Sequence, residues 1–447
     1  MNSFKRIVNT IATKNRRFLS TKKRKYPIQS EDAEKLPVFQ YSVSKEGYRR
    51  VFAWGNIQTG ALGIQYIKRN ENPEKVAYIK NPKRIGFGEK FQVKAAACGF
   101  GFTIFAINSK TDNKIYGCGI NTDSQIGYHE IRHQKPLGLL FSPRPIPLPF
   151  LNPEKCEILK VAAGRAHTLI LTTEGIFTLG NNAYGQCGRK IIPDENYTMS
   201  NYINHIENID GKRIIDIECG QDHSLALTED GCVYSCGWGA DGQTGLGHFV
   251  NAETFSRVKG DIESEKITKL SCRSDFVLAL NEKGDIFGWG NIEYSQITLP
   301  DGSQQLANPK YINMFQGLGR IKSIASAGSF CVIVNEHGQV YSWGYGLLGT
   351  GPEVQQSKIP VLIPETLFGK NDFQPENIVN KVVCGLNYVA AVTSSGDLYT
   401  WGRNKSCCLG LGNEKDQYFP LKVAMGGHVQ NVFCGIDHTI AICKPFI

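Results

Sequence analysis

The chain has 447 residues, of which 41% are hydrophobic and 47 are glycine, so it carries enough apolar material for a globular body. Lys and Arg outnumber Asp and Glu by 50 to 41, but residues 1–30 hold nine basic residues and no acidic one, which leaves a body with no net charge. Such a body argues against broad binding to a nucleic-acid backbone. The absence of a run of about 18 apolar residues argues against a membrane span.

Residues 1–30 combine their basic side chains with apolar residues at helical spacing, namely Phe4, Ile7, Val8 and Ile11. A basic, acid-free, amphipathic leader is typical of a mitochondrial transit peptide. The basic run 22–25 leaves a nuclear localisation signal or a basic arm that binds nucleic acid as alternatives. We predict a transit peptide at 1–30, a linker at 31–48 and a folded domain at 49–447, located in the mitochondrial matrix or on the matrix face of the inner membrane.

From residue 51 onward, a strand-like stretch that ends in an aromatic or small residue followed by Gly occurs seven times. The final glycines of these stretches are Gly55, Gly119, Gly180, Gly237, Gly290, Gly344 and Gly402. Recurrence at a nearly constant interval of 53 to 64 residues predicts a repeat architecture.

A second motif keeps the same period and ends in a His that stands three positions after the repeat Gly, or in an aromatic residue at the equivalent position. The seven final residues are Phe102, His167, His223, Phe276, Phe330, Tyr388 and His438. An apolar run and a short turn then lead to the next aromatic-Gly stretch, which predicts a β-hairpin. Because His exchanges with Phe and Tyr at this position, we expect a packed ring there rather than an acid–base catalyst.

The two ends of the chain carry complementary half-repeats. The first element is the aromatic-Gly strand at Val51, and the last is the other half of a repeat, residues 432–442. A linear row of repeats would leave an unpaired sheet edge at each end, whereas a closed ring leaves none. The sequence therefore predicts an all-β fold, a seven-bladed β-propeller whose closing blade is shared by the N- and C-terminal strands, with Phe52 near Thr439.

The cysteines and the glycine-rich stretches follow the same repeat. Five of the fourteen cysteines share one register, Cys98, Cys219, Cys272, Cys384 and Cys434, which indicates a packing site for a small residue rather than a disulfide framework. The stretches 237–242 and 344–349 match Gly-x-Gly-x-x-Gly, but both fall in one repeat register, which favours turns over a dinucleotide site. We expect no metal site, no cofactor and no covalent catalysis.

The two motifs resemble the regulator of chromosome condensation (RCC1) repeat family over about residues 49–447. The stretches 181–190, 219–224, 235–248 and 416–420 most resemble its mitochondrial G-exchanging-factor-like member. The resemblance implies a guanine-nucleotide exchange (releasing) factor, acting on a dynamin-like GTPase of inner-membrane fusion. It also implies an alternative, a non-catalytic scaffold in mitochondrial ribosome assembly that supports the large-subunit rRNA with pseudouridine synthases. Whether the protein has exchange activity is left open.

The resemblance also implies candidate contact residues. In the nuclear member of the family, acidic and His residues of the second motif face the bound GTPase, which points here to Asp222, His223, Asp437 and His438. That member also inserts a β-wedge, and the candidate segment here is 189–197, with contacts at Arg189, Lys190, Asp194 and Glu195. The alternatives are an Asp that caps a turn and a solvated connector. We expect protein partners, with RNA contacted weakly or indirectly and peripheral inner-membrane association left open.

Overall fold

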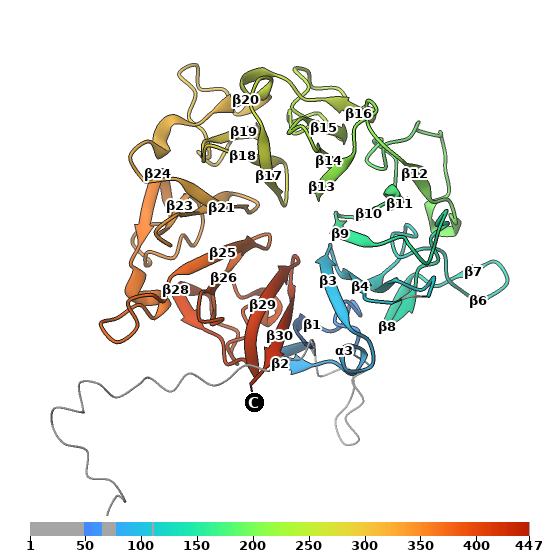
Figure 1. The fold of residues 1–447 in the computed structure, drawn as a ribbon, viewed down its shortest axis with the longest axis horizontal. Coiled ribbons are helices and arrows are strands. Elements are labelled where there is room, and N and C mark those ends of the chain that lie inside the picture. The colour runs from blue at the N-terminus through green and yellow to red at the C-terminus, as the bar shows by residue number, and fades with distance from the viewer. Residues whose placement is uncertain (1–48, 65–76, 110, 447) are drawn as a thin grey trace, which may run out of the picture. The chain divides into compact units, whose positions relative to one another are not determined.

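The computed structural model describes residues 49–64, 77–109 and 111–446, and these residues form a seven-bladed β-propeller (Figure 1). Each blade is a four-stranded antiparallel sheet, and the innermost strands of all seven blades surround a central channel. The predicted fold class is confirmed. The predicted transit peptide and linker lie outside the described residues.

The innermost strand of each blade carries the first half of the second motif. These strands are β3 (Val93–Cys98), β9 (Ile158–Ala163), β13 (Ile214–Cys219), β17 (Ile267–Cys272), β21 (Ile321–Ser326), β25 (Val379–Cys384) and β29 (Gly427–Cys434). The second strands begin at the His or aromatic residue of the motif. They are β4 (Phe102–Ile107), β10 (His167–Thr172), β14 (His223–Thr228), β18 (Phe276–Asn281), β22 (Phe330–Asn335), β26 (Tyr388–Thr393) and β30 (His438–Pro445).

The third strands are the aromatic-Gly stretches, and the fourth strands lie at the rim. The third strands are β5 (Ile115–Ile120), β11 (Gly175–Gly180), β15 (Val233–Gly237), β19 (Ile286–Asn291), β23 (Val340–Tyr345), β27 (Leu398–Gly402) and β1 (Arg50–Asn56). The rim strands are β8 (Leu139–Pro145), β12 (Asn204–Ile206), β16 (Ala252–Arg257), β20 (Gln305–Tyr311), β24 (Gln356–Ile363), β28 (Gln417–Lys422) and β2 (Tyr78–Arg84). We number the blades 1 to 7 in the order of their innermost strands.

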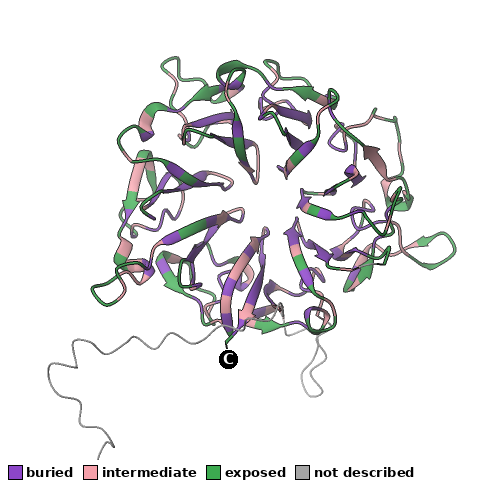
Figure 2. Ribbon diagram, in the orientation of Figure 1, coloured by how far each residue is buried: buried purple, intermediate pink, exposed green. Residues whose placement is uncertain are grey.

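Burial explains why these sequences differ between positions in a blade. Six of the second strands are buried at every residue, because both faces of the sheet pack against neighbouring blades there, and their sequences are nearly all apolar. The rim strands are exposed at most positions, and their sequences are polar (Figure 2). The five cysteines of the shared register are buried, as predicted for a small packing residue.

Blade 7 closes the ring with strands from both ends of the chain, in the order β2-β1-β30-β29. Strand β1 pairs with β30 over six residues, with Phe52 opposite Ala441 and Trp54 opposite Thr439. One apolar cluster continues from blade 6 through blade 7 into blade 1 and includes Tyr388, Trp54 and Phe105. The predicted shared closing blade is confirmed.

Neighbouring blades are joined by a recurring hydrogen bond onto a backbone carbonyl in the glycine-rich turn of the preceding blade. Where the second strand carries Thr or Ser, its hydroxyl donates this bond, in the pairs Thr103–Ala61, Thr168–Gln125, Ser224–Gln186 and Thr439–Cys408, at 2.7 to 2.9 Å. Where that position is apolar, the indole N–H of the paired third strand replaces it, in the pairs Trp289–Gln243 and Trp343–Gln296, at 3.0 and 2.9 Å. Trp54 also donates to Cys408 O.

The few elements outside the blades are short. They are the helix α3 (Gly86–Lys90), the hairpin β6 (Glu130–Arg132) and β7 (Lys135–Pro136), and the 3₁₀ turns η2 (Tyr197–Met199), η3 (Gly260–Ile262), η4 (Asn313–Phe315), η5 (Glu365–Phe368) and η6 (Lys405–Cys407). None of the helices in the described part of the chain is long and apolar enough to cross a membrane.

The junction between blades 5 and 6 gives a test of the carbonyl hydrogen bond. Trp401 occupies the same register as Trp289, but its indole nitrogen is buried without a partner. We expect Trp289→Phe to destabilise the fold by about 1 kcal/mol more than Trp401→Phe, because only the former loses a hydrogen bond and leaves a buried carbonyl unpaired. Urea unfolding of both variants measures this difference, and equal losses would contradict it.

Candidate partner-binding face

The predicted contact residues lie on one face of the propeller, which we call the loop face. It is formed by the loops that follow the innermost strands and the loops that follow the third strands, which emerge together because the strands of a blade alternate in direction. Backbone hydrogen bonds join the two kinds of loop, from Trp238 N to Asp222 O (2.9 Å) and from Asn56 N to Asp437 O (3.0 Å). Segment 189–197 belongs to the loop after the third strand of blade 2.

Asp222 forms a two-point ion pair with Arg165 of the neighbouring blade. The Arg165 Nε lies 3.0 Å from Asp222 Oδ1, and its Nη2 lies 2.9 Å from Oδ2. The carboxylate side chain is only 10% exposed, whereas that of Arg165 is 47% exposed. Burial raises the pKa of Asp222, and Arg165 opposes this shift. The cation, rather than Asp222, is therefore the more accessible half of the pair.

Asp437 makes a different set of contacts. Its Oδ2 accepts a hydrogen bond from Asn56 Nδ2 (2.7 Å), and its Oδ1 lies 3.5 Å from His438 Nδ1. Burial favours a higher pKa for Asp437, but His438 and Asn56 outweigh it and lower the value. Although burial lowers the pKa of His438, the Cys98 sulfur and the Asp437 carboxylate raise it to about 9. The two Asp-His motifs therefore differ: Asp222 is paired with an Arg of the neighbouring blade, whereas Asp437 lies beside the His of its own motif.

The motif histidines are buried between blades, where they take part in the junctions. Ser224 Oγ donates its proton to Gln186 O, so its oxygen accepts from His167 Nε2 at 3.0 Å. His438 Nε2 lies 2.9 Å from Thr103 Oγ1 in the same arrangement. His223 has no partner at either ring nitrogen, because the next blade carries Val277 at the hydroxyl position.

Full burial leaves the imidazoles of His223 and His438 no surface for direct contact with a partner. These two residues would act on a partner by positioning the loops beside them. The prediction of a packed ring at this register is confirmed, while the role of Asp222, His223, Asp437 and His438 in partner binding stays a prediction.

Segment 189–197 folds back on itself. Arg189 Nη2 lies 2.5 Å from Glu195 Oε1, and both side chains are nearly buried. The Arg189 guanidinium also stacks over the Tyr202 ring at 4.9 Å, whereas Lys190 and Asp194 are exposed. The segment contains no β-strand, so the expected β-wedge is wrong here. Pro193 and the short polar stretches between residues 189 and 203 do not supply an alternating strand pattern.

Among the described residues, one two-stranded sheet lies outside the seven blades, and it is the hairpin β6–β7. It lies in the loop after the third strand of blade 1 and projects from the ring (Figure 1). The sequence signal was the length of the insertion between Tyr128 and Leu151, which carries several prolines and basic residues.

Several residues of the loop face were not singled out from the sequence. Aromatic side chains from neighbouring blades meet there, Tyr184 with Trp238 at 4.6 Å between ring centroids and Tyr294 with Tyr345 at 6.2 Å. Carboxylates also accept hydrogen bonds across blade boundaries, in the pairs Asn181–Asp123, Gln305–Asp241 and Gln243–Asp275. A Tyr or Trp soon after the third-strand Gly was the available signal, and it recurs in four blades.

The chemistry of this face is that of a binding surface. Within residues 49–64, 77–109 and 111–446, no group of three or more His, Cys, Asp or Glu side chains is arranged to hold a metal ion. The glycine-rich stretch 237–242 forms a turn, as predicted, with Gly237 at a φ of +107°. A Cβ on Gly237 would lie 2.6 Å from Asp222 O, so this glycine is required by the close approach of the two loops.

Comparison with known proteins agrees with this architecture. The regulator of chromosome condensation (RCC1) repeat matches residues 174–227, 230–280, 337–392 and 395–442, and a second model of the same repeat matches 158–186, 214–243 and 379–406. The chain belongs to the RCC1 repeat family.

Its relatives include two RCC1-like G exchanging factor-like proteins. The mouse protein is 43% identical over 423 residues, covering 92% of this chain and 91% of its own length, and the human protein is 41% identical over 425 residues. The crystal structure of human WBSCR16 superimposes with a TM-score of 0.83 at 41% identity and covers 89% of this chain and 100% of that chain. Prp20p from Saccharomyces cerevisiae, at 18% identity and a TM-score of 0.72, shares the fold.

The unpaired ring nitrogens of His223 lead to a stability prediction. Phe occupies the same register in blades 1, 4 and 5, so His223→Phe is expected to fit and to stabilise the fold by about 1–2 kcal/mol, because it removes two buried unsatisfied polar atoms. His167→Phe, the matched control, loses the bond to Ser224 and is expected to destabilise. Urea unfolding of both variants checks the signs.

Val277→Thr is expected to stabilise the wild-type protein by giving His223 a hydroxyl partner, and to destabilise the His223→Phe variant. Such non-additivity would demonstrate direct coupling between the two positions. Additive effects would show that the two side chains do not interact.

A pH dependence follows from the same residue. Burial lowers the pKa of His223 to about 3, below the value of about 6.5 expected in the unfolded chain. As the pH falls from 6.5 toward 3, the unfolded chain takes up a proton at His223 but the folded chain does not, so the wild-type protein loses stability over this range. We expect the advantage of His223→Phe over wild type to be larger at pH 5 than at pH 7.5. An advantage that is constant with pH would contradict the shift.

Proposed function

We propose that this protein acts in mitochondria as a guanine-nucleotide exchange factor, for a dynamin-like GTPase of inner-membrane fusion. The identity of more than 40% over nine-tenths of its length to RCC1-like G exchanging factor-like proteins supports the activity class. Prp20p, whose structure was described together with its binding to Gsp1p and histones, has the same fold. The basic amphipathic leader supports the location.

The observation that carries the proposal is the construction of the loop face. Loops from adjacent blades are tied together by charged and polar pairs such as Arg165–Asp222 and Asn181–Asp123, so the surface is held in one arrangement before a partner arrives. Exposed groups at the ends of these loops, among them Lys190, Asp194 and Tyr345, are available for contact. Preorganised loops on a rigid scaffold lower the entropic cost of binding.

Such a face promotes exchange without covalent chemistry. If it binds the nucleotide-free GTPase more tightly than the nucleotide-bound form, the same factor weakens the affinity of the GTPase for nucleotide. The required property is thus a difference in affinity between two states of the partner. Segment 189–197 lies in the longest loop of this face in blade 2 and contributes the exposed Lys190 and Asp194 to it.

Nucleotide release measures this directly. Purified protein is expected to accelerate release of a fluorescent GDP analogue from a mitochondrial dynamin-like GTPase, and Lys190→Ala with Asp194→Asn to reduce the acceleration at least fivefold. Asn tolerates the positive φ of Asp194, so the loop should keep its fold. Glu207→Gln, at an exposed site on the opposite face, is the control. No acceleration at a large molar excess would overturn the proposal.

Proximity labelling in the organelle separates exchange from the ribosome-assembly alternative. Loss of a labelled GTPase in the Lys190/Asp194 variant supports exchange, whereas labelling of pseudouridine synthases with no GTPase supports the scaffold function. Deletion of residues 1–30 is expected to abolish import into isolated mitochondria, and import of the truncated chain would contradict the location.

A further inference from the structure

The central channel is lined by a ring of residues that occupy one register of the seven innermost strands. Side chains alternate between the channel and the blade interior, so every second residue faces the channel. Each innermost strand contributes to this ring the residue that stands three positions before the Cys register. The seven residues are Ala95, Lys160, Asp216, Lys269, Ser323, Lys381 and Asn431. Three lysines therefore meet at one level of a cavity of about 580 Å³.

The three lysines are not equally neutralised. Lys160 Nζ lies 2.6 Å from Asp216 Oδ1 and 2.7 Å from Glu218 Oε1. Burial acts to lower the pKa of Lys160, but the two carboxylates outweigh it and raise the value. The two carboxylates of this trio therefore hold its cation firmly.

The other two lysines donate to neutral oxygens. Lys269 Nζ donates to the backbone carbonyl of Lys322 (2.5 Å), and Lys381 Nζ donates to Asn431 Oδ1 (3.3 Å). Burial lowers the pKa of both, and for Lys381 the charges of Lys160 and Lys269 lower it further. Their mutual repulsion in a confined space is unfavourable for the empty channel.

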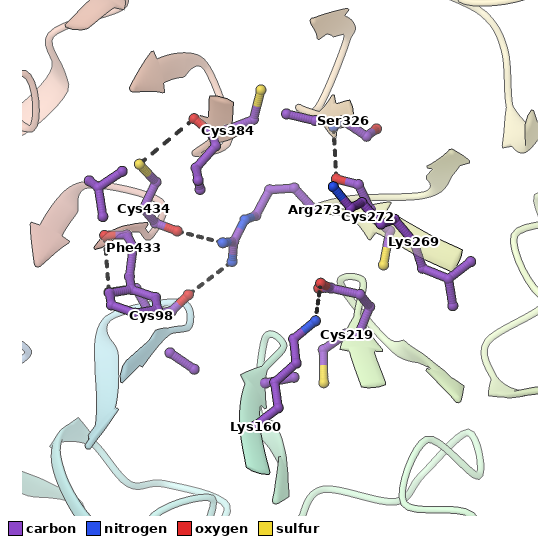
Figure 3. A pocket seen from close by; sticks show the side chains of 18 of the residues that line it. Cys98, Lys160, Cys219, Lys269, Cys272, Arg273, Ser326, Cys384, Phe433 and Cys434 are labelled. Atoms are coloured by element: carbon purple, nitrogen blue, oxygen red, sulfur yellow. Dashed lines mark hydrogen bonds and ion pairs between the residues drawn. The ribbon is translucent and has the colours of Figure 1, made fainter. Parts of the chain in front are cut away.

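A fourth cation crosses the channel near the loop face. Arg273 stands where five of the other repeats carry Gly and blade 5 carries Ala327, and its guanidinium reaches the far side of the channel, donating to Cys98 O (2.9 Å) and Cys434 O (2.5 Å) (Figure 3). Its Nε is buried without a partner. The guanidinium thus bridges blade 4 to blades 1 and 7 and narrows this end, so that the lysine level is reached from the opposite face.

The cavity lining holds four cations, Lys160, Lys269, Arg273 and Lys381, against two carboxylates, Asp216 and Glu218. We propose that the channel is a binding site for a compact oxyanion with two or more negative charges, held by Lys269 and Lys381 and entering from the face opposite the loop face. Ammonium groups bind phosphate and carboxylate oxygens as point charges. The cavity has the size of a small-metabolite site. Phosphate-type and polycarboxylate-type ligands share this chemistry.

Binding is tested on the full chain with pyrophosphate and with citrate, each against KCl of equal ionic strength, by calorimetry and thermal unfolding. We expect one of the two anions to raise the unfolding temperature, and Lys269→Met with Lys381→Met to weaken its binding at least tenfold. The double variant should fold at least as well as wild type without ligand, because the repulsion is gone. Lys322→Met is the matched control, since that exposed lysine directs its Nζ to Glu336 O, and it should change affinity less than twofold.

Tighter binding of pyrophosphate than citrate would assign a phosphate-type ligand, and the reverse a polycarboxylate. Either order supports the site. Stabilisation by neither anion beyond that by KCl would overturn the proposal, as would equal binding to wild type and the double variant.

Discussion

The closed ring depends on the hydrogen bond that six of the seven blades make to a backbone carbonyl of the preceding blade. The blades are separate four-stranded sheets, so no strand ladder continues from one to the next. A hydroxyl on the second strand or an indole on the third strand bridges six of the seven junctions among the described residues. Because the acceptor lies in a buried turn, leaving it unpaired would be costly. The bond therefore fixes the spacing and orientation of adjacent blades.

This junction explains residue choices that look unrelated in the sequence. In blades 1 to 3 a hydroxyl on the second strand is paired with a small or aliphatic residue on the third, as in Ser224 with Cys236, whereas in blades 4 to 6 an apolar second-strand residue is paired with Trp, as in Val277 with Trp289. Blade 7 has both, Thr439 and Trp54. The hydroxyl also contacts a His or Tyr of the preceding blade, since Ser224 Oγ lies 3.0 Å from His167 Nε2 and Thr439 Oγ1 lies 2.8 Å from the Tyr388 hydroxyl oxygen. His223 faces Val277 and so lacks its partner.

The two faces and the channel show how a repeat acquires distinct sites. The repeat supplies equivalent positions around the ring, and single departures from it create asymmetry. Arg165 and Asp222 form a charged pair between blades 2 and 3, and Arg273 in place of Gly changes one end of the channel. Since the scaffold is rigid, each departure is presented at a fixed place.

The sequence by itself determined the fold to a large extent. The period, the alternation of the strands and the complementary half-repeats at the two ends specified seven blades and a shared closing blade, because each is a local or a counting property. Burial of the Cys register and of His167, His223 and His438 also followed from exchange with apolar residues at equivalent positions. The class of protein followed from the same motifs.

Only the tertiary structure decided what lies across a blade boundary. The partner of a motif His lies in the next blade, 57 residues away for His167 and 335 residues away for His438, and Val277 in place of a hydroxyl residue leaves His223 unpaired. Arg189 and Glu195 were predicted as contacts for a partner, but their side chains are nearly buried and pair with each other, and the lysines of the channel converge from three separate blades. Such convergence depends on how the ring closes in space, which no local pattern encodes.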